Sequence, residues 1–301
     1  MQITVVLFPR FSNLCLANTL EPLRAANDLS GDALFRWQLA AMEEGPVTSS
    51  SGIEIQTSTA LSEARGDLLI VLPSYGFQTA ATARTRAALR AASLRFKILA
   101  GFDMGAWLLA DAGLLDGYRA TLHRDEIEAF AERFPAVDTL QDPYVRDRDR
   151  LTCAGGAAAL EPMLDLVAMQ GNAALRLDVA LLFHAPGVAG RPGAPTATSR
   201  QVARVLDLMG QHLEEPLPLP TLAERAGLSL RGLDRLTREK LSTSPAALYR
   251  RLRLLKARRL VQDGDMAVTE IALRTGYTNA SAMTRAFRRE FGSSPRALRG
   301  Q

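Results

Sequence analysis

Cysteine is scarce in this chain. Among 301 residues only Cys15 and Cys153 carry a thiol, and no Cys-x-x-Cys pair occurs. Two isolated cysteines exclude a disulfide-stapled scaffold and leave no ligand spacing for zinc. We therefore expect no metal and no cofactor. Each cysteine is more typical of a small core residue than of a nucleophile.

Long hydrophobic runs are also missing. A membrane helix needs about 18 or more consecutive apolar residues, and no such stretch occurs. Residues 1–8 lack the basic segment and the small-residue cleavage site of a secretion signal, and they resemble a first β-strand instead. We expect a protein that makes no membrane contact and works in the reducing cytoplasm.

Charge is distributed unevenly along the chain. Residues 200–301 hold 19 basic and 10 acidic side chains, a net charge of +9, although the whole chain carries only +4. The preceding residues therefore carry −5. A basic segment on an acidic body is typical of a module that binds a polyanion such as nucleic acid. A basic face that is merely solvated explains the charge equally well.

Proline and glycine gather in residues 185–199, which indicates a linker between domains at 1–184 and 200–301. Before this linker, β-rich runs alternate with helical patterns, as in an α/β fold with a parallel sheet covered on both faces. The predicted strands are 3–8, 35–42, 68–72 and 97–100. The predicted helices are 14–28, 79–93, 104–112, 125–134, 160–169 and 173–184. After the linker the pattern is helical only.

An internal repeat is the strongest signal in the chain. Residues 221–229 align with 270–278 at an offset of 49, and 241–245 align with 291–295 at an offset of 50. Each copy has an apolar residue and an alanine, and a glycine four residues after the alanine suits a tight turn. Ser229 and Thr278 are expected to cap the helix that follows.

The change of offset predicts one extra residue in the second turn. A serine–proline pair then begins the next helix of each copy. The repeat predicts two helix-turn-helix units joined by one connecting helix. The apolar stripe expected on that helix is Leu248, Leu252, Leu255 and Leu260.

Residues 206–299 resemble the AraC/XylS family of bacterial regulators, whose signature ends in Phe-Gly-x-Ser-Pro, here residues 291–295. The resemblance implies double-stranded DNA as partner, with two recognition helices in major grooves about 10 bp apart. Thr237 stands where the family usually has an aromatic residue. By position, the implied base-facing residues are Arg231, Asp234, Arg235, Ala280, Ser281, Thr284 and Arg285. Arginine suits guanine and aspartate suits cytosine.

A second motif, Gly-x-Asp-x-Gly at residues 101–105, follows the strand predicted at 97–100. This spacing forms a nucleophile elbow, a sharp strand-to-helix turn that exposes its central residue. With residues 20–27 and 110–123 it resembles the DJ-1/PfpI and class I glutamine amidotransferase-like domains, which implies a flavodoxin-like sheet. Enzymes of this fold place cysteine at the elbow. Here Asp103 replaces it, and a carboxylate is a poor nucleophile toward amides.

The elbow therefore predicts a ligand sensor without catalytic residues. Asp103 at a helix N-terminus is expected to stay charged and to bind a cationic group of an amine or amino acid. Glu21 is the implied second carboxylate, Tyr75 and Trp107 are expected to add a cation–π face, and His123 occupies the family's histidine position. In the alternative interpretation, Trp107 is a core residue and Asp103 only caps its helix.

Together these patterns predict a ligand-responsive transcriptional regulator that is not an enzyme. The resemblance further implies a homodimer formed through the first domain. The alternative function is a hydrolase that uses Asp103 as its nucleophile. Such an enzyme also needs an acid–histidine pair, for which only His123 lies close in the sequence.

Overall fold

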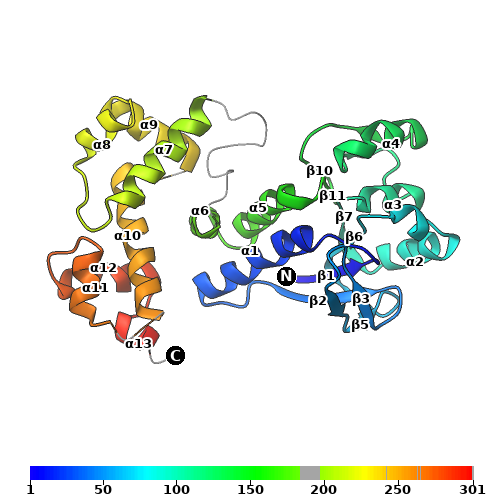
Figure 1. Ribbon diagram of the computed structural model, residues 1–301, viewed down its shortest axis with the longest axis horizontal. Helices are drawn as coiled ribbons and strands as arrows, with labels where there is room; N and C mark the ends of the chain where they lie inside the picture. Colours follow the sequence, from blue (N-terminus) through cyan, green and yellow to red (C-terminus); the bar gives the residue numbers. More distant parts are fainter. Residues whose placement is uncertain (184–196, 242, 263, 265, 300–301) are drawn as a thin grey trace. The chain divides into compact units, whose positions relative to one another are not determined.

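The computed structural model describes residues 1–183, 197–241, 243–262, 264 and 266–299 (Figure 1). The chain divides into two units, Met1–Val179 and Ala180–Gln301. Most of the predicted linker, residues 185–196, lies outside the described residues, so the limits assigned to the linker stay a prediction.

A seven-stranded sheet forms the centre of the first unit. Four strands were predicted from their apolar runs, namely β1 (Gln2–Leu7), β2 (Arg36–Ala41), β6 (Gly66–Leu72) and β7 (Phe96–Phe102). The other three are β5 (Thr59–Ala60), β10 (Tyr144–Asp147) and β11 (Arg150–Cys153). Strands of two to four residues are too short to show a period, so the sequence did not predict them.

Two further pairs of strands form small separate sheets. They are β3 (Pro46–Thr48) with β4 (Glu54–Gln56), and β8 (Arg119–Ala120) with β9 (Asp138–Thr139). Neither pair was predicted.

The strand order of the large sheet is β10-β11-β7-β6-β1-β2-β5. All neighbours are parallel except β10 and β11. Numbered along the chain, the five central parallel strands follow the order 2-1-3-4-5, which is the flavodoxin-like order. Residues 68–72 of β6 are fully buried, as a strand covered on both faces requires. The predicted α/β fold is confirmed.

Helices cover both faces of this sheet. α1 (Asn13–Ser30) and α5 (Leu160–Gln170) pack against each other on one face, and α2 (Ala83–Ser93) and α3 (Gly105–Asp111) lie on the other (Figure 1). Under α2 and α3, Val71 of the sheet, Leu108 of α3 and Phe130 of α4 (Ile127–Arg133) share one hydrophobic core.

Two helices begin later than predicted. The first residues of the segment 79–93 belong to a 3-10 turn, η1 (Phe77–Ala80), and α2 starts only after Thr82, whose side chain accepts a hydrogen bond from the N–H of Thr85. The segment 125–134 likewise opens with a 3-10 turn, η2 (Arg124–Glu126). α6 (Ala173–Leu182) and a third turn, η3 (Gly156–Ala159), complete the helical elements of this part.

The described residues of the second unit contain helices and no strand, as predicted. α7 (Ala197–Gln211) precedes the first helix-turn-helix unit, α8 (Leu219–Arg225) and α9 (Leu230–Leu241). α10 (Pro245–Gln262) connects it to the second, α11 (Val268–Arg274) and α12 (Ala280–Phe291), and α13 (Pro295–Arg299) follows. Both α10 and α13 begin at the proline of a serine–proline pair, as expected.

The buried side of α10 differs from the predicted stripe. Leu248 is buried, whereas Leu252, Leu255 and Leu260 are only half-buried. The residues that enter the core of the second helix-turn-helix unit are Leu254, Ala257 and Val261. Because α10 contacts helices of both helix-turn-helix units, more than one side of α10 is buried. The spacing of its leucines alone therefore cannot identify one buried stripe.

Candidate functional site

The two helix-turn-helix units bury equivalent residues. The apolar–alanine pairs of the repeat are at most 1% exposed, and they are Leu222, Ala223, Ile271 and Ala272. The small alanine lets the second helix of each unit cross closely. Gly227 and Gly276 have φ values of 71° and 72°, a left-handed conformation that suits glycine. The turn chemistry expected from the repeat is therefore present in both copies.

The turns differ by one residue. The first turn spans residues 226–229 and the second spans 275–279, which accounts for the change of offset. Ser229 caps α9 as predicted, since its hydroxyl accepts from the N–H of Gly232 at 3.1 Å. The prediction for Thr278 is wrong. Asn279 caps α12 by accepting from the N–H of Ala282 at 2.8 Å, because the extra residue shifts the cap by one position.

The outward face of α9 carries the predicted arginines. Arg231 and Arg235 are exposed, one helical turn apart. Asp234 is half-exposed, and its carboxylate lies 2.8 Å from Nε of Arg238. A contact from Asp234 to cytosine would therefore compete with this ion pair. Arg238 was not predicted, although its spacing from Arg231 and Arg235 places it on the same face.

The outward face of α12 is more basic than its predicted residues suggested. Ser281 and Arg285 are exposed, whereas Ala280 and Thr284 are half-buried. A shallow hollow on this face is lined by Thr284, Arg285, Arg288 and Arg289. Arg288 and Arg289 were missed because only the first turns of the helix were matched to the family. The arginine spacing alone would have indicated them.

A side chain of the connecting helix holds the turn of the second unit. Nε and Nη2 of Arg253 on α10 donate to the carbonyls of Thr275 and Gly276 at 2.7 and 2.5 Å. The guanidinium also lies 4.3 Å from the centre of the Tyr277 ring. A Cβ at Gly276 would come within 2.7 Å of the Leu213 carbonyl, so this turn also packs against the segment before α8.

Tyr249, four residues earlier on α10, binds that same segment. Its hydroxyl donates to the carbonyl of His212 at 2.8 Å and accepts from the N–H of Leu217 at 3.2 Å. α10 therefore binds the segment before the first helix-turn-helix unit and the turn of the second one. These contacts fix the orientation of α9 and α12 relative to each other.

The elbow at the end of β7 has the predicted geometry. Asp103 has a φ of 58°, the left-handed conformation of an elbow residue. A Cβ at Gly105 would lie 2.0 Å from the carbonyl oxygen of Val71, and one at Gly101 would lie 2.4 Å from the amide nitrogen of Ala106. The two glycines thus allow α3 to approach the sheet.

Asp103 is 9% exposed and does not cap α3. Its Oδ2 accepts a hydrogen bond from the Ser74 hydroxyl at 2.7 Å, and that hydroxyl in turn accepts from the N–H of Ser12 at 3.0 Å. No side chain caps α3. Burial raises the pKa of Asp103, while the bond from Ser74 and the proximity of His123 oppose that rise. Burial is the largest of these causes, so the helix N-terminus does not set the direction of the pKa shift, and the cation-binding role of Asp103 stays a prediction.

Both cysteines lie beside Asp103, which was not predicted. The N–H of Asp103 donates to the Cys153 carbonyl at 2.9 Å. Burial raises the pKa of Cys153 to about 12 and that of Cys15 well above its usual range, and the charge of Asp103 adds to both shifts. Ser74 comes two residues after the end of β6, and Cys153 is the last residue of β11. Sites of this fold form at the carboxyl ends of the parallel strands, so this position would have indicated both residues.

The other predicted pocket residues lie in different surroundings. Glu21 forms an ion pair with Arg24 at 2.8 Å, and its side chain is 47% exposed. Trp107 packs among three aromatic rings, Phe77, Phe130 and Phe134, with ring centres 5.1 to 5.9 Å away. Trp107 is therefore a core residue, as the alternative interpretation had it. The carboxylate of Glu21 pairs with Arg24, and Glu21 is not among the groups that shift the pKa of Asp103.

His123 and Tyr75 remain near the elbow. The backbone N–H of His123 points to the Asp103 carbonyl at 3.4 Å, and its Nδ1 accepts from the N–H of Asp125. Tyr75 follows Ser74, is 60% exposed, and already has the guanidinium of Arg10 at 5.9 Å from its ring centre.

The amide that hydrolases of this fold use is occupied. In such enzymes the N–H after the nucleophile stabilises an oxyanion. Here the N–H of Met104 donates to the carbonyl of Pro73 at 3.2 Å. Among the described residues no group of three or more His, Cys, Asp or Glu side chains has a metal-binding arrangement. Within that same part of the chain no helix has the length and apolarity of a bilayer crossing.

Known proteins resemble this chain along nearly its whole length. It is 36% identical to the HTH-type transcriptional regulator CdhR of Pseudomonas aeruginosa over 302 residues, covering 96% of this chain and 89% of that protein. It is 33% identical to the HTH-type transcriptional regulator GlxA of Rhizobium meliloti over 308 residues, covering 99% and 95%. Both relatives are named as regulators, which supports the prediction that this chain is not an enzyme.

Solved structures and a family model match the separate parts of the chain. An AraC family transcriptional regulator from Pseudomonas putida superposes with a TM-score of 0.53 at 26% identity, covering 60% of this chain and 98% of that one. A ThiJ/PfpI family protein from Pseudomonas syringae superposes with a TM-score of 0.53 at 23% identity, covering 82% and 90%, and supports the fold. Residues 222–301 match the helix-turn-helix domain family. The chain therefore belongs to the AraC-type family of HTH-type transcriptional regulators, with a first unit of the DJ-1/PfpI fold.

Proposed function

We propose that this regulator reads double-stranded DNA through α9 and α12, and that a small amine or amino-acid-like molecule bound near Asp103 controls it. The observation that carries the DNA part is the pair of exposed arginine faces held in one frame by α10. Arg231, Arg235 and Arg285 are the residues proposed to contact base edges. The protein acts as a homodimer in the cytoplasm, which doubles its contact with DNA.

Selection from a random duplex pool tests the two-helix reading. We expect an enriched site in which each protomer reads two half-sites about 10 bp apart, because major grooves recur on one face of DNA at that interval. Arg235→Ala should weaken sequence preference in one half-site and Arg285→Ala in the other, each by about 1–3 kcal/mol. Arg84→Ala, an exposed arginine of the first unit paired with Glu43, is the control. Selection of no common site would refute the proposal.

The effector part rests on the surroundings of Asp103. Its ionised carboxylate is disfavoured by burial and has the Ser74 hydroxyl as a hydrogen-bond donor. A cation that reaches this carboxylate favours its charged form and so offsets the loss of solvation that burial causes. Tyr75 lies beside the site with an exposed ring, and the Arg10 guanidinium 5.9 Å from the centre of that ring supports a cation–π role for Tyr75.

Calorimetric titration with amino acids and betaines tests this part. Asp103→Ala should abolish binding of the ligand that binds the wild-type chain, and Asp138→Ala, an exposed aspartate of β9, should not. Binding should also weaken as the pH falls through the pKa of Asp103, since the neutral carboxyl no longer attracts a cation. Equal affinity in the wild type and Asp103→Ala would remove Asp103 from the site. Sedimentation of the full chain tests the dimer.

A further inference from the structure

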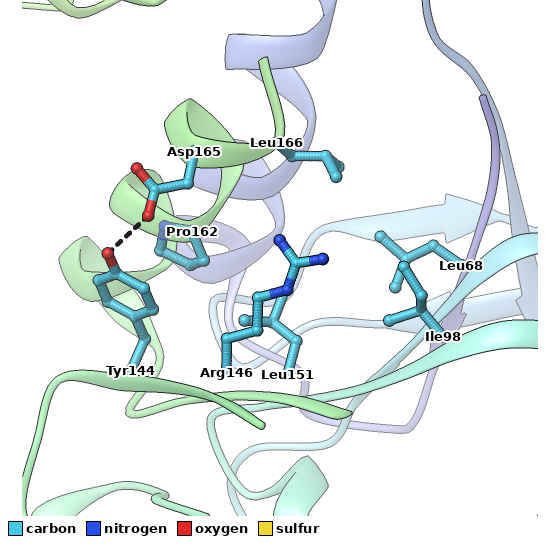
Figure 2. A pocket seen from close by; sticks show the side chains of 8 residues that line it. All are labelled: Leu68, Ile98, Tyr144, Arg146, Leu151, Pro162, Asp165 and Leu166. Carbon is cyan, nitrogen blue, oxygen red and sulfur yellow. Dashed lines mark hydrogen bonds between the residues drawn. The ribbon is translucent and has the colours of Figure 1, made fainter. Parts of the chain in front are cut away.

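A crevice lies in the first unit, on the side of the sheet that faces α5 (Figure 2). Its apolar walls are Leu68, Ile98, Leu151, Pro162 and Leu166. Ile98 lies on β7, five residues before Asp103, which places the crevice roughly 16 Å from the elbow along the strand direction. The crevice is therefore separate from the site of the proposed effector.

The sheet register explains why this surface is apolar. Leu68 of β6 pairs with Ile98 of β7, and Leu151 of β11 pairs with Ala100, so these side chains share one face. The cavity volume is about 50 Å³, several times the roughly 10–15 Å³ that one water needs. The crevice suits a small organic molecule and is too small for a nucleotide.

One cation, the exposed side chain of Arg146, lines the crevice. Arg146 on β10 pairs in register with Leu151, and its guanidinium lies amid the apolar lining in Figure 2. Its Nη1 contacts Sδ of Met169, and a thioether is a weak acceptor. No carboxylate in the described part of the chain lies within ion-pair distance of Arg146. The Arg146 guanidinium lies next to apolar side chains, and the sulfur of Met169 is the one acceptor recorded for it among the described residues. This arrangement fits a ligand with a carboxylate on a short carbon chain.

The opposite wall is linked to α6. Oδ2 of Asp165 accepts from the Tyr144 hydroxyl at 2.7 Å, and Oδ1 lies 3.3 Å from Nε of Arg176 on α6. Arg176 also pairs with Glu161 at 3.0 Å. The second carboxylate oxygen of Glu161 is buried without a hydrogen-bond partner. The network is thus incompletely satisfied, and α6 spans the boundary between the two units.

We propose that this crevice is a second binding site, for a small aliphatic carboxylate held by Arg146, and that its occupancy reaches α6 through Tyr144, Asp165 and Arg176. The ligand's carbon chain rests on Ile98, Leu151 and Leu166. Binding here is independent of Asp103 and of DNA. Only the regulatory consequence of moving α6 rests on the proposed function.

Calorimetry on the full chain with acetate, propionate and butyrate tests the site. Saturable binding should strengthen by up to about fourfold per added methylene while the crevice has room. Arg146→Gln should weaken propionate binding about tenfold or more. Arg133→Gln, an exposed arginine on α4, should leave it unchanged, and so should Asp103→Asn, which separates this site from the proposed effector site.

Propanol and propylamine are the matched ligands without a carboxylate. If either binds as tightly as propionate, or if Arg146→Gln binds propionate as the wild type does, Arg146 only covers apolar surface and the proposal is overturned. Ile98→Phe, which fills the crevice, should abolish binding. If that variant does not fold, Arg146→Gln still decides the question.

Amide hydrogen exchange of residues 173–182 tests the link to α6. Propionate should slow exchange there in the wild type. Asp165→Asn keeps an acceptor for Tyr144 but loses the charge facing Arg176, so propionate should still bind without slowing exchange in α6. Unchanged exchange in the propionate-bound wild type would overturn the link.

Discussion

At the scale of single residues, the elbow shows how a motif fixes a position without fixing its chemistry. The glycines at 101 and 105 create the sharp turn by allowing close backbone contact. The residue between them decides what the turn does. Asp103 places a buried carboxylate where enzymes of this fold have a thiol. Its Oδ2 accepts a hydrogen bond from the Ser74 hydroxyl, and the neighbouring N–H of Met104 donates to the carbonyl of Pro73.

Gly105→Ala should destabilise the first unit by about 3 kcal/mol or more, because its Cβ would lie 2.0 Å from a backbone oxygen that cannot move away. Both tryptophans, Trp37 and Trp107, belong to this unit, so urea unfolding followed by their fluorescence measures the effect. Gly210→Ala in α7 meets no atom within 4 Å and should instead stabilise its helix by up to about 1 kcal/mol, measured by circular dichroism. Equal effects of the two substitutions would contradict this reading.

Asp103→Asn should stabilise the first unit at neutral pH by on the order of 1 kcal/mol. A carboxyl whose pKa is raised by folding binds its proton more tightly in the folded state, so stability falls as the pH rises from the unfolded to the folded pKa. Asparagine removes that loss and keeps an acceptor for Ser74. The variant's advantage should disappear below the ordinary aspartate pKa of 3.8. An advantage that does not depend on pH would show that ionisation is not its cause.

At the scale of elements, α10 is more than a spacer. Arg253 and Tyr249 bind backbone groups of the second turn and of the segment before α8, respectively. Polar contacts to backbone carbonyls fix orientation as well as distance, because each bond has a preferred direction. The relative pose of α9 and α12 therefore depends on side chains that do not themselves face outward.

Arg253→Gln should lower affinity for a selected two-half-site DNA by about tenfold, since two hydrogen bonds to the turn are lost. The clearer measurement is how strictly the protein requires one distance between the half-sites. The wild type should tolerate only one distance between half-sites, and the variant should bind sites lengthened by one base pair nearly as well as the original. Arg250→Gln, an exposed arginine on the same helix, removes the same charge and should keep the spacing preference. If Arg253→Gln requires the same half-site distance as the wild type, Arg253 does not position the second recognition helix.

At the scale of the whole molecule, charge and fold divide the chain in the same way. The basic side chains gather in the helical unit that resembles DNA-binding domains, and the acidic excess lies in the α/β unit. Arginines missed by motif matching, such as Arg238, Arg288 and Arg289, extend the basic faces of α9 and α12. Their place along the helices, away from the first turn, suits contact with phosphates.

Affinity for DNA should fall about a thousandfold or more between 50 and 200 mM salt, as when at least six phosphates are contacted. Arg288→Ala and Arg289→Ala should each reduce the slope of log affinity against log salt by about 1 and weaken all sequences alike. Anisotropy measurements over a salt series give this slope. A flat salt dependence would show that the basic face is merely solvated.

Periodic features of this protein could be read from its sequence because they repeat locally. The four longest strands, the α/β class with a parallel sheet, both helix-turn-helix units and the extra residue of the second turn all follow from spacing along the chain. Local spacing could not identify the cap at Asn279 in place of Thr278, because both residues are suitable caps and the turn geometry chooses between them.

The amino-acid order by itself indicated the longer helices and strands and the two helix-turn-helix units, because those properties depend on neighbours in the chain. Only the tertiary structure decided that Cys15, Cys153 and Ser74 lie near Asp103, and that Trp107 belongs to the core and Glu21 to an ion pair. It also decided that Arg146 lines an apolar crevice. Those side chains meet through the sheet register and the packing of helices on it, and residues distant in sequence carry no local sign of that meeting.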